Sequence, residues 1–168
     1  MRTKILGRTG LEASIVGLGT IFIGNLEVSG GPRELDEDVG AQTVEAAIEA
    51  GCTWIDTAPV YAGTGSEKII GQVLRQRPDL ADRCTVVTKA GSLRTGKDHS
   101  FDGILGSVEA SQERLGISQF DIVYIHDALN VSVEEVMSDN GALGALRKLQ
   151  KEGVVRFIGS ATNDPKIN

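Results

Sequence analysis

Cysteine is scarce in this sequence, and an excess of basic residues and long apolar runs are missing from it. Cys52 and Cys84 are too few for a disulfide framework and lack the spacing of metal ligands, so we expect reduced thiols and no metal site. The 17 basic and 23 acidic residues give a net charge of −6, which argues against nucleic acid or an anionic membrane as a partner. No apolar run approaches the roughly 18 residues of a membrane span, and residues 1–10 do not resemble a signal peptide. We therefore expect a cytoplasmic protein.

The length and composition predict a single folded domain over residues 1–168. Hydrophobic residues make up 40% of the chain and charged residues 24%, which is typical of a globular protein and excludes a disordered one. The sequence has no low-complexity segment and no strong internal repeat. A chain of 168 residues matches roughly one domain.

Short apolar segments alternate with amphipathic ones along the chain. After a hairpin around residues 7–10, we expect strands at 15–18, 53–55, 84–88, 120–125 and 154–159, and helices at 39–50, 67–75, 101–115 and 141–151. Residues 24–36 form the longest irregular stretch. The strands are continuous apolar runs, which indicates burial on both faces of a parallel sheet. The alternation predicts an α/β fold, and the order alone fits both an open sheet and a closed barrel.

Polar side chains stand where three of these strands end. Asp56, Lys89 and His126 each follow an apolar strand, and Tyr61 comes five residues after Asp56. The carboxyl ends of parallel strands share one face, so we expect an acid, an amine, an imidazole and a phenol to meet there. A buried ammonium favours the phenolate, so Lys89 would activate Tyr61 to protonate a developing alkoxide. His126 would donate a hydrogen bond to the same oxygen.

Each of these residues also has an ordinary structural interpretation. An aspartate after a strand is often a turn or cap residue, Tyr61 fits a half-buried aromatic, and a lone histidine fits a core position. Lys89 is harder to explain in this way, because a lysine after three β-branched residues is seldom buried without a partner. The four together favour a catalytic site more than any one of them does alone.

Three other patterns predict less chemistry. Residues 17–24 begin like a dinucleotide-binding fingerprint, but the third glycine is misplaced and no helix is expected to follow. Residues 63–67 resemble a phosphate-binding loop without its lysine, so we interpret them as a turn with Ser66 as a helix cap. His99 lies in a polar loop with no second ligand at metal spacing, and we expect its side chain to be solvated.

The whole set of motifs resembles the aldo-keto reductase superfamily. The resemblance rests on Leu6-Gly7-Arg8-Thr9-Gly10-Leu11, Gly17-Leu18-Gly19-Thr20, Asp56-Thr57-Ala58 with Tyr61, Gly65-Ser66-Glu67 with Gly71, Thr88-Lys89, Ile125-His126 and Val155-Arg156-Phe157-Ile158-Gly159. The family implies a TIM (β/α)8 barrel whose bottom is closed by an N-terminal hairpin, and reduction of carbonyls with a nicotinamide cofactor. The segments around His126-Asp127 and Gly153-Val154-Val155-Arg156 are most similar to the sugar and aldose dehydrogenase branch.

The resemblance also assigns roles to individual residues. It implies Tyr61 as the general acid, Lys89 and Asp56 as the residues that tune it, and His126 as the residue that orients a small carbonyl or sugar substrate. For the cofactor, NADP or NAD, it implies contacts from Gly19, Thr20, Asp56, Ser160 and Asn163. Family members often have Ser-Asn directly after the fifth strand, whereas this chain has Ser160-Ala161-Thr162-Asn163, so Ser160, Asn163 or neither holds the nicotinamide.

The length suggests a partial barrel. A TIM barrel needs about 250 residues and eight strands, whereas we expect a hairpin and about five βα units here. In the family, the segments that hold the pyrophosphate and adenosine follow the later strands. We therefore expect a truncated barrel whose open edge promotes self-association. The alternative function is a non-catalytic fragment, or a regulatory or redox-sensing subunit of the same fold.

We expect the 168-residue polypeptide by itself to bind NADPH and NADH weakly or not at all, and to show no useful turnover. Tight binding of a flexible dinucleotide needs contacts along its whole length to offset the loss of its freedom. Quenching of Trp54 fluorescence during titration measures the affinity. Saturable binding at micromolar concentration by the monomer would contradict this expectation.

Overall fold

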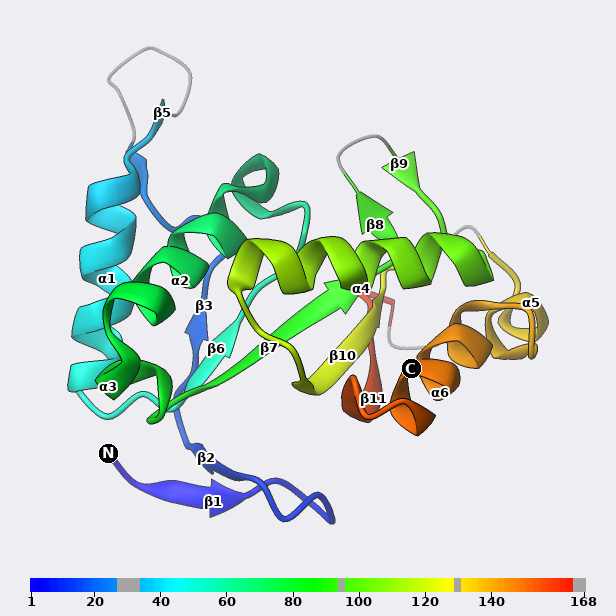
Figure 1. Ribbon diagram of the computed structural model, residues 1–168, viewed down its shortest axis with the longest axis horizontal. Helices are drawn as coiled ribbons and strands as arrows, with labels where there is room; N and C mark the ends of the chain where they lie inside the picture. The colour runs from blue at the N-terminus through cyan, green and yellow to red at the C-terminus, as the bar shows by residue number, and fades with distance from the viewer. Residues whose placement is uncertain (27–33, 94–95, 129–130, 165–168) are drawn as a thin grey trace.

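An N-terminal hairpin opens the chain in the computed structural model, which describes residues 1–26, 34–93, 96–128 and 131–164 (Figure 1). Strands β1 (Thr3–Ile5) and β2 (Glu12–Ser14) pair antiparallel, as expected. The hairpin lies at the end of the sheet where the parallel strands begin. It is fixed there because the Ser14 amide donates to Thr53 Oγ1 at 2.9 Å and the Thr53 amide donates to Ser14 Oγ at 3.0 Å.

Five parallel strands form the central sheet. In chain order they are β3 (Leu18–Gly19), β6 (Trp54–Asp56), β7 (Thr85–Ala90), β10 (Phe120–His126) and β11 (Val155–Ala161). Their order in the sheet is β11-β10-β7-β6-β3, so strands that follow one another in the chain are neighbours in space. This confirms the α/β architecture of successive βα units, the type found in a TIM barrel.

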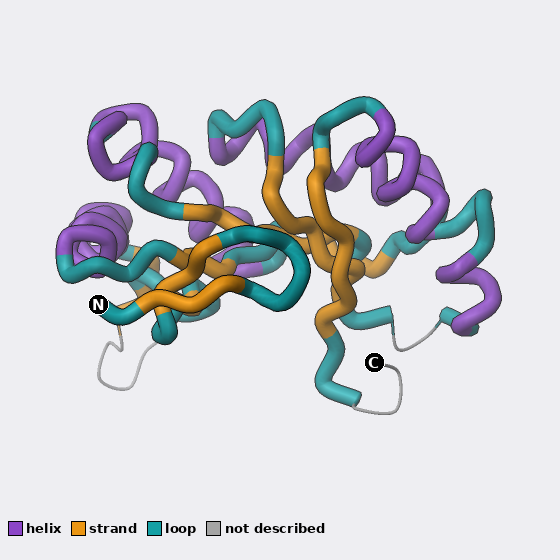
Figure 2. Tube along the Cα trace, turned by 90° about the horizontal axis from the view of Figure 1, so that it is seen from below, coloured by secondary structure: helices purple, strands orange, loops and turns teal. Residues whose placement is uncertain are grey.

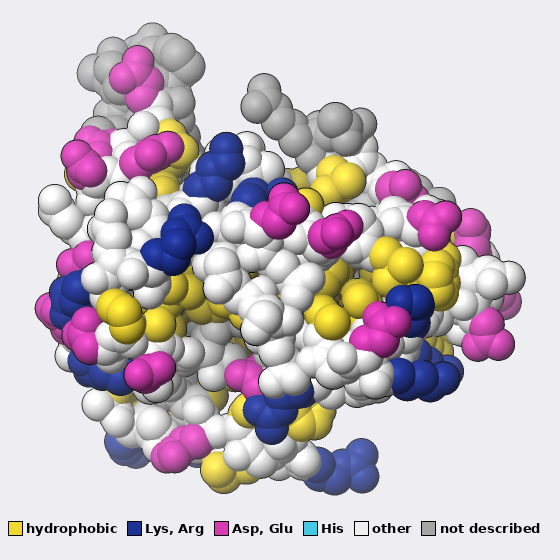
Figure 3. All heavy atoms as spheres, viewed as in Figure 1, with side chains coloured by type: hydrophobic (Ala, Val, Ile, Leu, Met, Phe, Trp, Pro, Cys, Tyr) yellow, Lys and Arg dark blue, Asp and Glu magenta, His cyan; other side chains and the backbone are white. Residues whose placement is uncertain are grey.

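The helices lie on one face of this sheet (Figures 1 and 2). They are α1 (Glu37–Glu49), α2 (Gly65–Gln76), α3 (Pro78–Ala81), α4 (Phe101–Leu115), α5 (Val133–Met137) and α6 (Ala142–Lys151). The core lies between helices and strands and includes Val44, Ile48, Ile70, Val123 and Leu146. Charged side chains of both signs are spread over the helical face (Figure 3).

Two short antiparallel pairs extend from the carboxyl end of the sheet. They are β4 (Asn25–Leu26) with β5 (Glu34–Leu35), and β8 (Ser92–Leu93) with β9 (Gly96–Lys97). Sequence periodicity does not detect two-residue strands, so we expected irregular chain at residues 24–36; residues 27–33 of that stretch lie outside the described part. A short 3-10 helix, η1 (Tyr61–Thr64), leads into α2.

Several predicted boundaries are confirmed and others are corrected. Helix α4 has the predicted limits, with Ser100 accepting the Gly103 amide at its start and Gly116 in the left-handed region (φ +71°) at its end. Strand β7 continues to Ala90, so Lys89 lies inside the strand. Ser66 does not cap α2, because its side chain is fully buried in a chain of hydroxyls.

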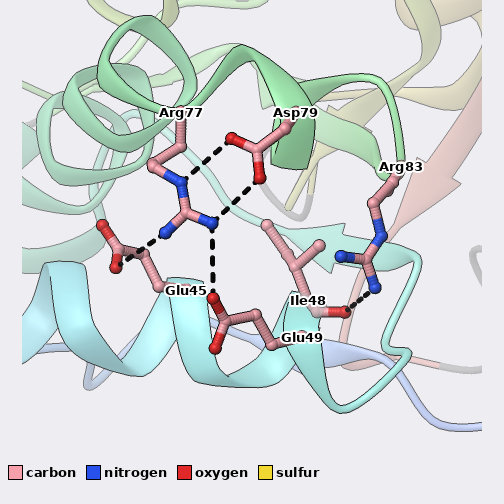
Figure 4. A network of polar contacts seen from close by, with 6 residues as sticks. All are labelled: Glu45, Ile48, Glu49, Arg77, Asp79 and Arg83. Atoms are coloured by element: carbon pink, nitrogen blue, oxygen red, sulfur yellow. Dashed lines mark hydrogen bonds and ion pairs between the residues drawn. The ribbon is translucent and has the colours of Figure 1, made fainter.

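Arg77 connects α1 to the junction between α2 and α3 (Figure 4). Its guanidinium donates two hydrogen bonds of 2.9 Å to Asp79 and lies 3.5 Å from Glu45 and 3.3 Å from Glu49. The hydrogen bond from Arg77 lowers the pKa of Asp79 below its usual value. Arg83 donates to a backbone carbonyl of α1 at 3.1 Å. Such exposed pairs orient the helices but contribute little to stability.

Buried charges connect α2, α4 and β7. Glu67 is fully buried, and its carboxylate accepts hydrogen bonds of 2.6 Å from Arg114 Nε and from Thr88 Oγ1. Arg114 also donates to Ser111 at 3.1 Å. A buried carboxylate is tolerated when both of its oxygens have such partners. The contact fixes two helices on the strand that carries Lys89.

The outer strands of the described sheet are β3 and β11. Apolar side chains of Ile5, Ile15 and Val16 are exposed near the hairpin. Self-association through such surfaces stays a prediction. Within the described ranges, no helix combines the length and the apolar character needed to cross a membrane.

We expect Arg114→Met to lower the free energy of unfolding by about 3 kcal/mol, because it leaves the buried Glu67 carboxylate without its charged partner. The double variant Glu67→Gln, Arg114→Met should recover most of this loss. Urea unfolding measures both, with Arg75→Met as a control on the exposed side of α2. An Arg114→Met loss no larger than that of Arg75→Met would contradict the role of this ion pair.

Candidate active site

Neighbouring strands bring Asp56, Lys89 and His126 to one end of the sheet. Asp56 is the last residue of β6, Lys89 the penultimate residue of β7 and His126 the last residue of β10. Because β6, β7 and β10 are adjacent and parallel, their carboxyl ends lie side by side. The three side chains therefore meet as the sequence predicts, while their chemical roles stay predictions.

Lys89 is the buried charge of this group. Its side chain is 6% exposed, and its ammonium lies 2.5 Å from Asp56 Oδ1 and donates to the Thr57 carbonyl at 2.9 Å. These two acceptors compensate for the loss of hydration that a lysine suffers inside a strand. Lys89 is thus within hydrogen-bond reach of Asp56, as the proposed constellation requires.

Tyr61 lies close to Lys89 and precedes a left-handed turn. Ala62, Gly63 and Thr64 follow it with φ values of +48°, +62° and +80°. For residues with a side chain this conformation costs about 1–2 kcal/mol each, and such strain persists where the surroundings enforce it, often at functional sites. The Lys89 ammonium lies 4.7 Å from the centre of the Tyr61 ring, a cation–π contact.

His126 completes the group from β10. Its ring stands edge-on to Tyr61, with 6.1 Å between ring centres and 88° between planes. Burial lowers the pKa of His126 to about 4, and the nearby positive charge of Lys89 adds to this effect. The imidazole is therefore neutral at pH 7, with one nitrogen as donor and the other as acceptor. Its Nδ1 atom is buried and has no hydrogen-bond partner in the described part of the chain.

A cavity of about 720 Å³ opens at this end of the sheet. Its walls come from the loops after β3, β6, β7, β10 and β11, and include Ile21, Tyr61, Lys89, Lys97, His126 and Asn163. A phenol, an ammonium and a neutral imidazole thus border one space that is large enough for a small substrate.

The sequence as a whole matches the model of the aldo/keto reductase family over residues 16–167. This chain belongs to that family. The match covers most of the chain, including all the strands of the central sheet. Both the strand order and the four side chains around the cavity thus occur in a member of a family of oxidoreductases.

Curated relatives of this family member include two sugar dehydrogenases. It is 36% identical over 156 residues to L-galactose dehydrogenase of Arabidopsis thaliana, covering 93% of the chain and 47% of the relative. It is 33% identical over 174 residues to D-threo-aldose 1-dehydrogenase of a Pseudomonas species, covering 89% and 50%. The chain therefore spans about half the length of these relatives.

A solved structure shows the same fold. An aldo-keto reductase from Bacillus halodurans, in its holo form, superposes with a TM-score of 0.80 at 23% identity, covering 99% of this chain and 52% of that one. The identity is low, so this likeness supports the TIM-barrel type of fold and nothing finer.

The residues predicted to contact the cofactor differ in their exposure to solvent. Asn163 is exposed on the cavity wall, whereas Ser160 is exposed on β11 and Gly19 on β3, in register with Asp56. Thr20 is fully buried, and its hydroxyl donates to the Asp56 carbonyl at 2.8 Å. The Thr20 side chain therefore holds Asp56 in place and does not reach the cavity surface. Cofactor contacts by these residues stay predictions.

The prediction of a solvated His99 is wrong. His99 is 6% exposed, and its Nε2 atom lies 2.8 Å from the backbone oxygen of His126. Ser92 Oγ donates to the same oxygen at 3.0 Å. The surrounding sequence is polar, but the contacts of Ser92 and His99 with the His126 carbonyl place this segment against the end of β10, where the ring is buried. Gly91, with φ +98° and close to this ring, is a signal that sequence analysis missed.

Lys97 and Asp127 are a second pair that sequence analysis did not single out. Lys97 Nζ donates to the Asp127 carbonyl at 3.0 Å and lies 3.5 Å from its carboxylate. Asp127 has a φ of +55° directly after His126. Both residues border the cavity, so the β8–β9 pair is attached to the loop that follows the imidazole.

The cysteines are free in the structure, as expected from the sequence. Cys52 is buried, and burial raises the pKa of the Cys84 thiol to about 11. A thiol with this pKa is protonated at neutral pH and reacts slowly with oxidants, which argues against redox sensing by Cys84. Among the described residues, no three His, Cys, Asp or Glu side chains are grouped to hold a metal ion.

We expect the stability of the chain to fall in mild acid because of His126. Its pKa is about 4 in the folded state and 6.5 when solvated, so the unfolded chain binds more protons between these values. The His126 contribution is complete above about pH 6.5 and is lost as the pH falls toward 4. Urea unfolding over this range should show a smaller pH dependence for His126→Gln, whose amide does not titrate. Equal pH dependence in both proteins would contradict the burial of a neutral His126.

Proposed function

We propose that this chain supplies the catalytic residues of an oxidoreductase that interconverts an aldehyde or ketone and an alcohol with NADP or NAD. The observation that carries the proposal is the position of the Lys89 ammonium, 2.5 Å from Asp56 and 4.7 Å from the centre of the Tyr61 ring. This ion pair lies beside the cavity that Tyr61 and His126 also border. Membership in the aldo/keto reductase family supports the same reaction class.

The proposed reaction assigns one task to each side chain. When bound, the reduced nicotinamide supplies the hydride that adds to the carbonyl carbon. Tyr61 donates its phenolic proton to the carbonyl oxygen, and the Lys89 ammonium stabilises the phenolate that remains. Asp56 keeps Lys89 charged by accepting its hydrogen bond at 2.5 Å. In the reverse direction, the Tyr61 phenolate takes the proton from the alcohol.

His126 is proposed to orient the substrate. Its low pKa, about 4, keeps the imidazole neutral at pH 7, so it does not compete with Tyr61 as an acid. A neutral ring that carries its proton on Nε2 donates one hydrogen bond to the carbonyl oxygen. The edge-on contact with Tyr61 places both donors beside the same space.

The cofactor is proposed to enter from the side of β11. Asn163 presents an exposed amide on the cavity wall, and an amide both donates to and accepts from the carboxamide of a nicotinamide. Ser160 is exposed near the end of β11, whereas Gly19 is exposed on β3, at the opposite edge of the described sheet. Thr20 contributes through the backbone of Asp56.

A small sugar or related aldehyde is the proposed substrate. Around the catalytic groups, the cavity wall carries hydrogen-bonding side chains from Lys97, Asp127 and Thr162. These side chains can form hydrogen bonds with the hydroxyl groups of a sugar. Two of the relatives are named for L-galactose and D-threo-aldose.

We expect Tyr61→Phe to lower kcat for carbonyl reduction by about 10²–10⁴-fold, because the proton donor is lost. Cofactor affinity should stay unchanged, since the hydroxyl acts as the alkoxide forms. The chain spans about half the length of its relatives, so the assay uses two proteins. One is the chain alone, and the other is a fusion in which this chain replaces the matching part of the D-threo-aldose 1-dehydrogenase. Oxidation of NADPH or NADH reports the rate.

Tyr124→Phe is the matched control, because Tyr124 is the other tyrosine of the chain and lies on β10. It should keep the parent activity. Near-normal kcat in Tyr61→Phe would require another acid. Cofactor binding without turnover in the parent fusion would favour the regulatory subunit of the same fold.

A further inference from the structure

The carbonyl of His126 is held by side chains instead of by the sheet. Strand β7 pairs with β10 as far as Ala90 and Ile125, one residue before His126. Beyond that point, the His126 oxygen accepts hydrogen bonds from Ser92 Oγ at 3.0 Å and from His99 Nε2 at 2.8 Å. Ser92 and His99 both belong to the segment between β7 and α4. Their side chains thus extend the contact between β7 and β10 beyond the last paired residues.

The His99 ring is fixed in one tautomer by this contact. A carbonyl oxygen accepts hydrogen bonds and cannot donate, so His99 Nε2 carries a proton. The Nδ1 atom of His99 is buried and has no hydrogen-bond partner among the described residues. A buried unpaired nitrogen is unfavourable, so the hydrogen bond of His99 that contributes to the fold is the one from Nε2.

The backbone around His99 is arranged to leave space for the ring. Gly91 has φ +98°, and a Cβ atom there would lie 2.5 Å from His99 Cδ2. The Asp98 amide donates to the Gly91 carbonyl at 2.8 Å, and this hydrogen bond joins the residues on either side of the β8–β9 pair. On the other side, Ser100 donates to Asp98 through its amide at 3.0 Å and caps α4. His99 is therefore held from both sides.

The peptide between His126 and Asp127 is fixed at both of its polar atoms. Its oxygen is held by His99 and Ser92, and its amide donates to the Ala161 carbonyl at 2.8 Å. Asp127 has φ +55°, a strained value for a residue with a side chain. Such strain persists where contacts over-determine the backbone, and the two donors on the carbonyl supply that constraint.

We propose that His99 and Ser92 are positioning residues that clamp the His126–Asp127 peptide and so set where the His126 ring points. The clamp acts on the backbone of His126 and touches neither substrate nor cofactor. Its importance for the reaction rests on the proposed role of His126, whereas the clamp itself is a property of the folded chain and is measured without turnover.

The test uses the fact that the chain has two histidines. In His99→Gln and His99→Met, the ring signals of His126 are alone in long-range ¹H–¹⁵N spectra. Gln and Met have similar length and no charge, but Gln keeps a donor and Met does not. The charged groups that face His126, namely Lys89 on β7, Lys97 on β9, Asp127 and Asp56, are the same in both variants.

We expect His126 in His99→Gln to titrate near 4, as in the parent chain, and in His99→Met to titrate closer to 6.5, because the released strand end exposes the ring. Ser92→Ala removes the other donor and should shift the titration in the same direction by a smaller amount. The double variant His99→Met, Ser92→Ala should shift it most.

Identical His126 titration and ¹⁵N shifts in His99→Gln and His99→Met would overturn the clamp. If His99→Met does not fold, an unchanged His126 in Ser92→Ala has the same consequence. In the fusion enzyme, kcat should fall in His99→Met and recover in His99→Gln, with KM for the cofactor unchanged. An inactive parent fusion would count against the proposed function, and the spectra would still decide on the clamp.

Discussion

The parallel alignment of β6, β7 and β10 is the constraint on which the site depends. Each strand runs in the same direction, so the last residue of one lies beside the last residues of its neighbours. Asp56, Lys89 and His126 come from points 33 and 37 residues apart in the chain, yet the ladder places them at one edge. No local interaction among them is needed for this, because burial of the apolar strands under the helices fixes the register.

Two ion pairs, each with one buried member, compensate for the burial of charge in this arrangement. Glu67 with Arg114 fixes α2 and α4 on β7, because Thr88, the residue before Lys89, donates a hydrogen bond to Glu67. Lys89 with Asp56 then presents a positive charge directly beneath Tyr61. The same charge, together with burial, keeps His126 neutral. The structure of the sheet and the electrostatics of the site therefore depend on the same strand.

The loops that follow the strands also contribute side chains to the site. A left-handed turn joins Tyr61 to α2, and the Tyr61 ring contacts the Lys89 ammonium. After β7, His99 contacts the His126 carbonyl and Lys97 donates to the Asp127 carbonyl, so this loop lies against the end of β10. Ala62, Thr64 and Asp127 have positive φ values although they carry side chains. Each of these strained segments follows a residue that borders the cavity, Tyr61 in the first case and His126 in the second.

The sequence by itself determined the alternation of strands and helices, the limits of α4 and the three polar residues at the strand ends. These features follow from periodicity, capping and the position of polar residues after apolar runs, which are local properties. Only the tertiary structure decided that the side chains of Ser66 and Thr20 are buried, and that the His99 ring is buried next to Gly91. These outcomes depend on contacts between segments far apart in the chain, and a polar loop has the same composition whether or not another strand lies beneath it.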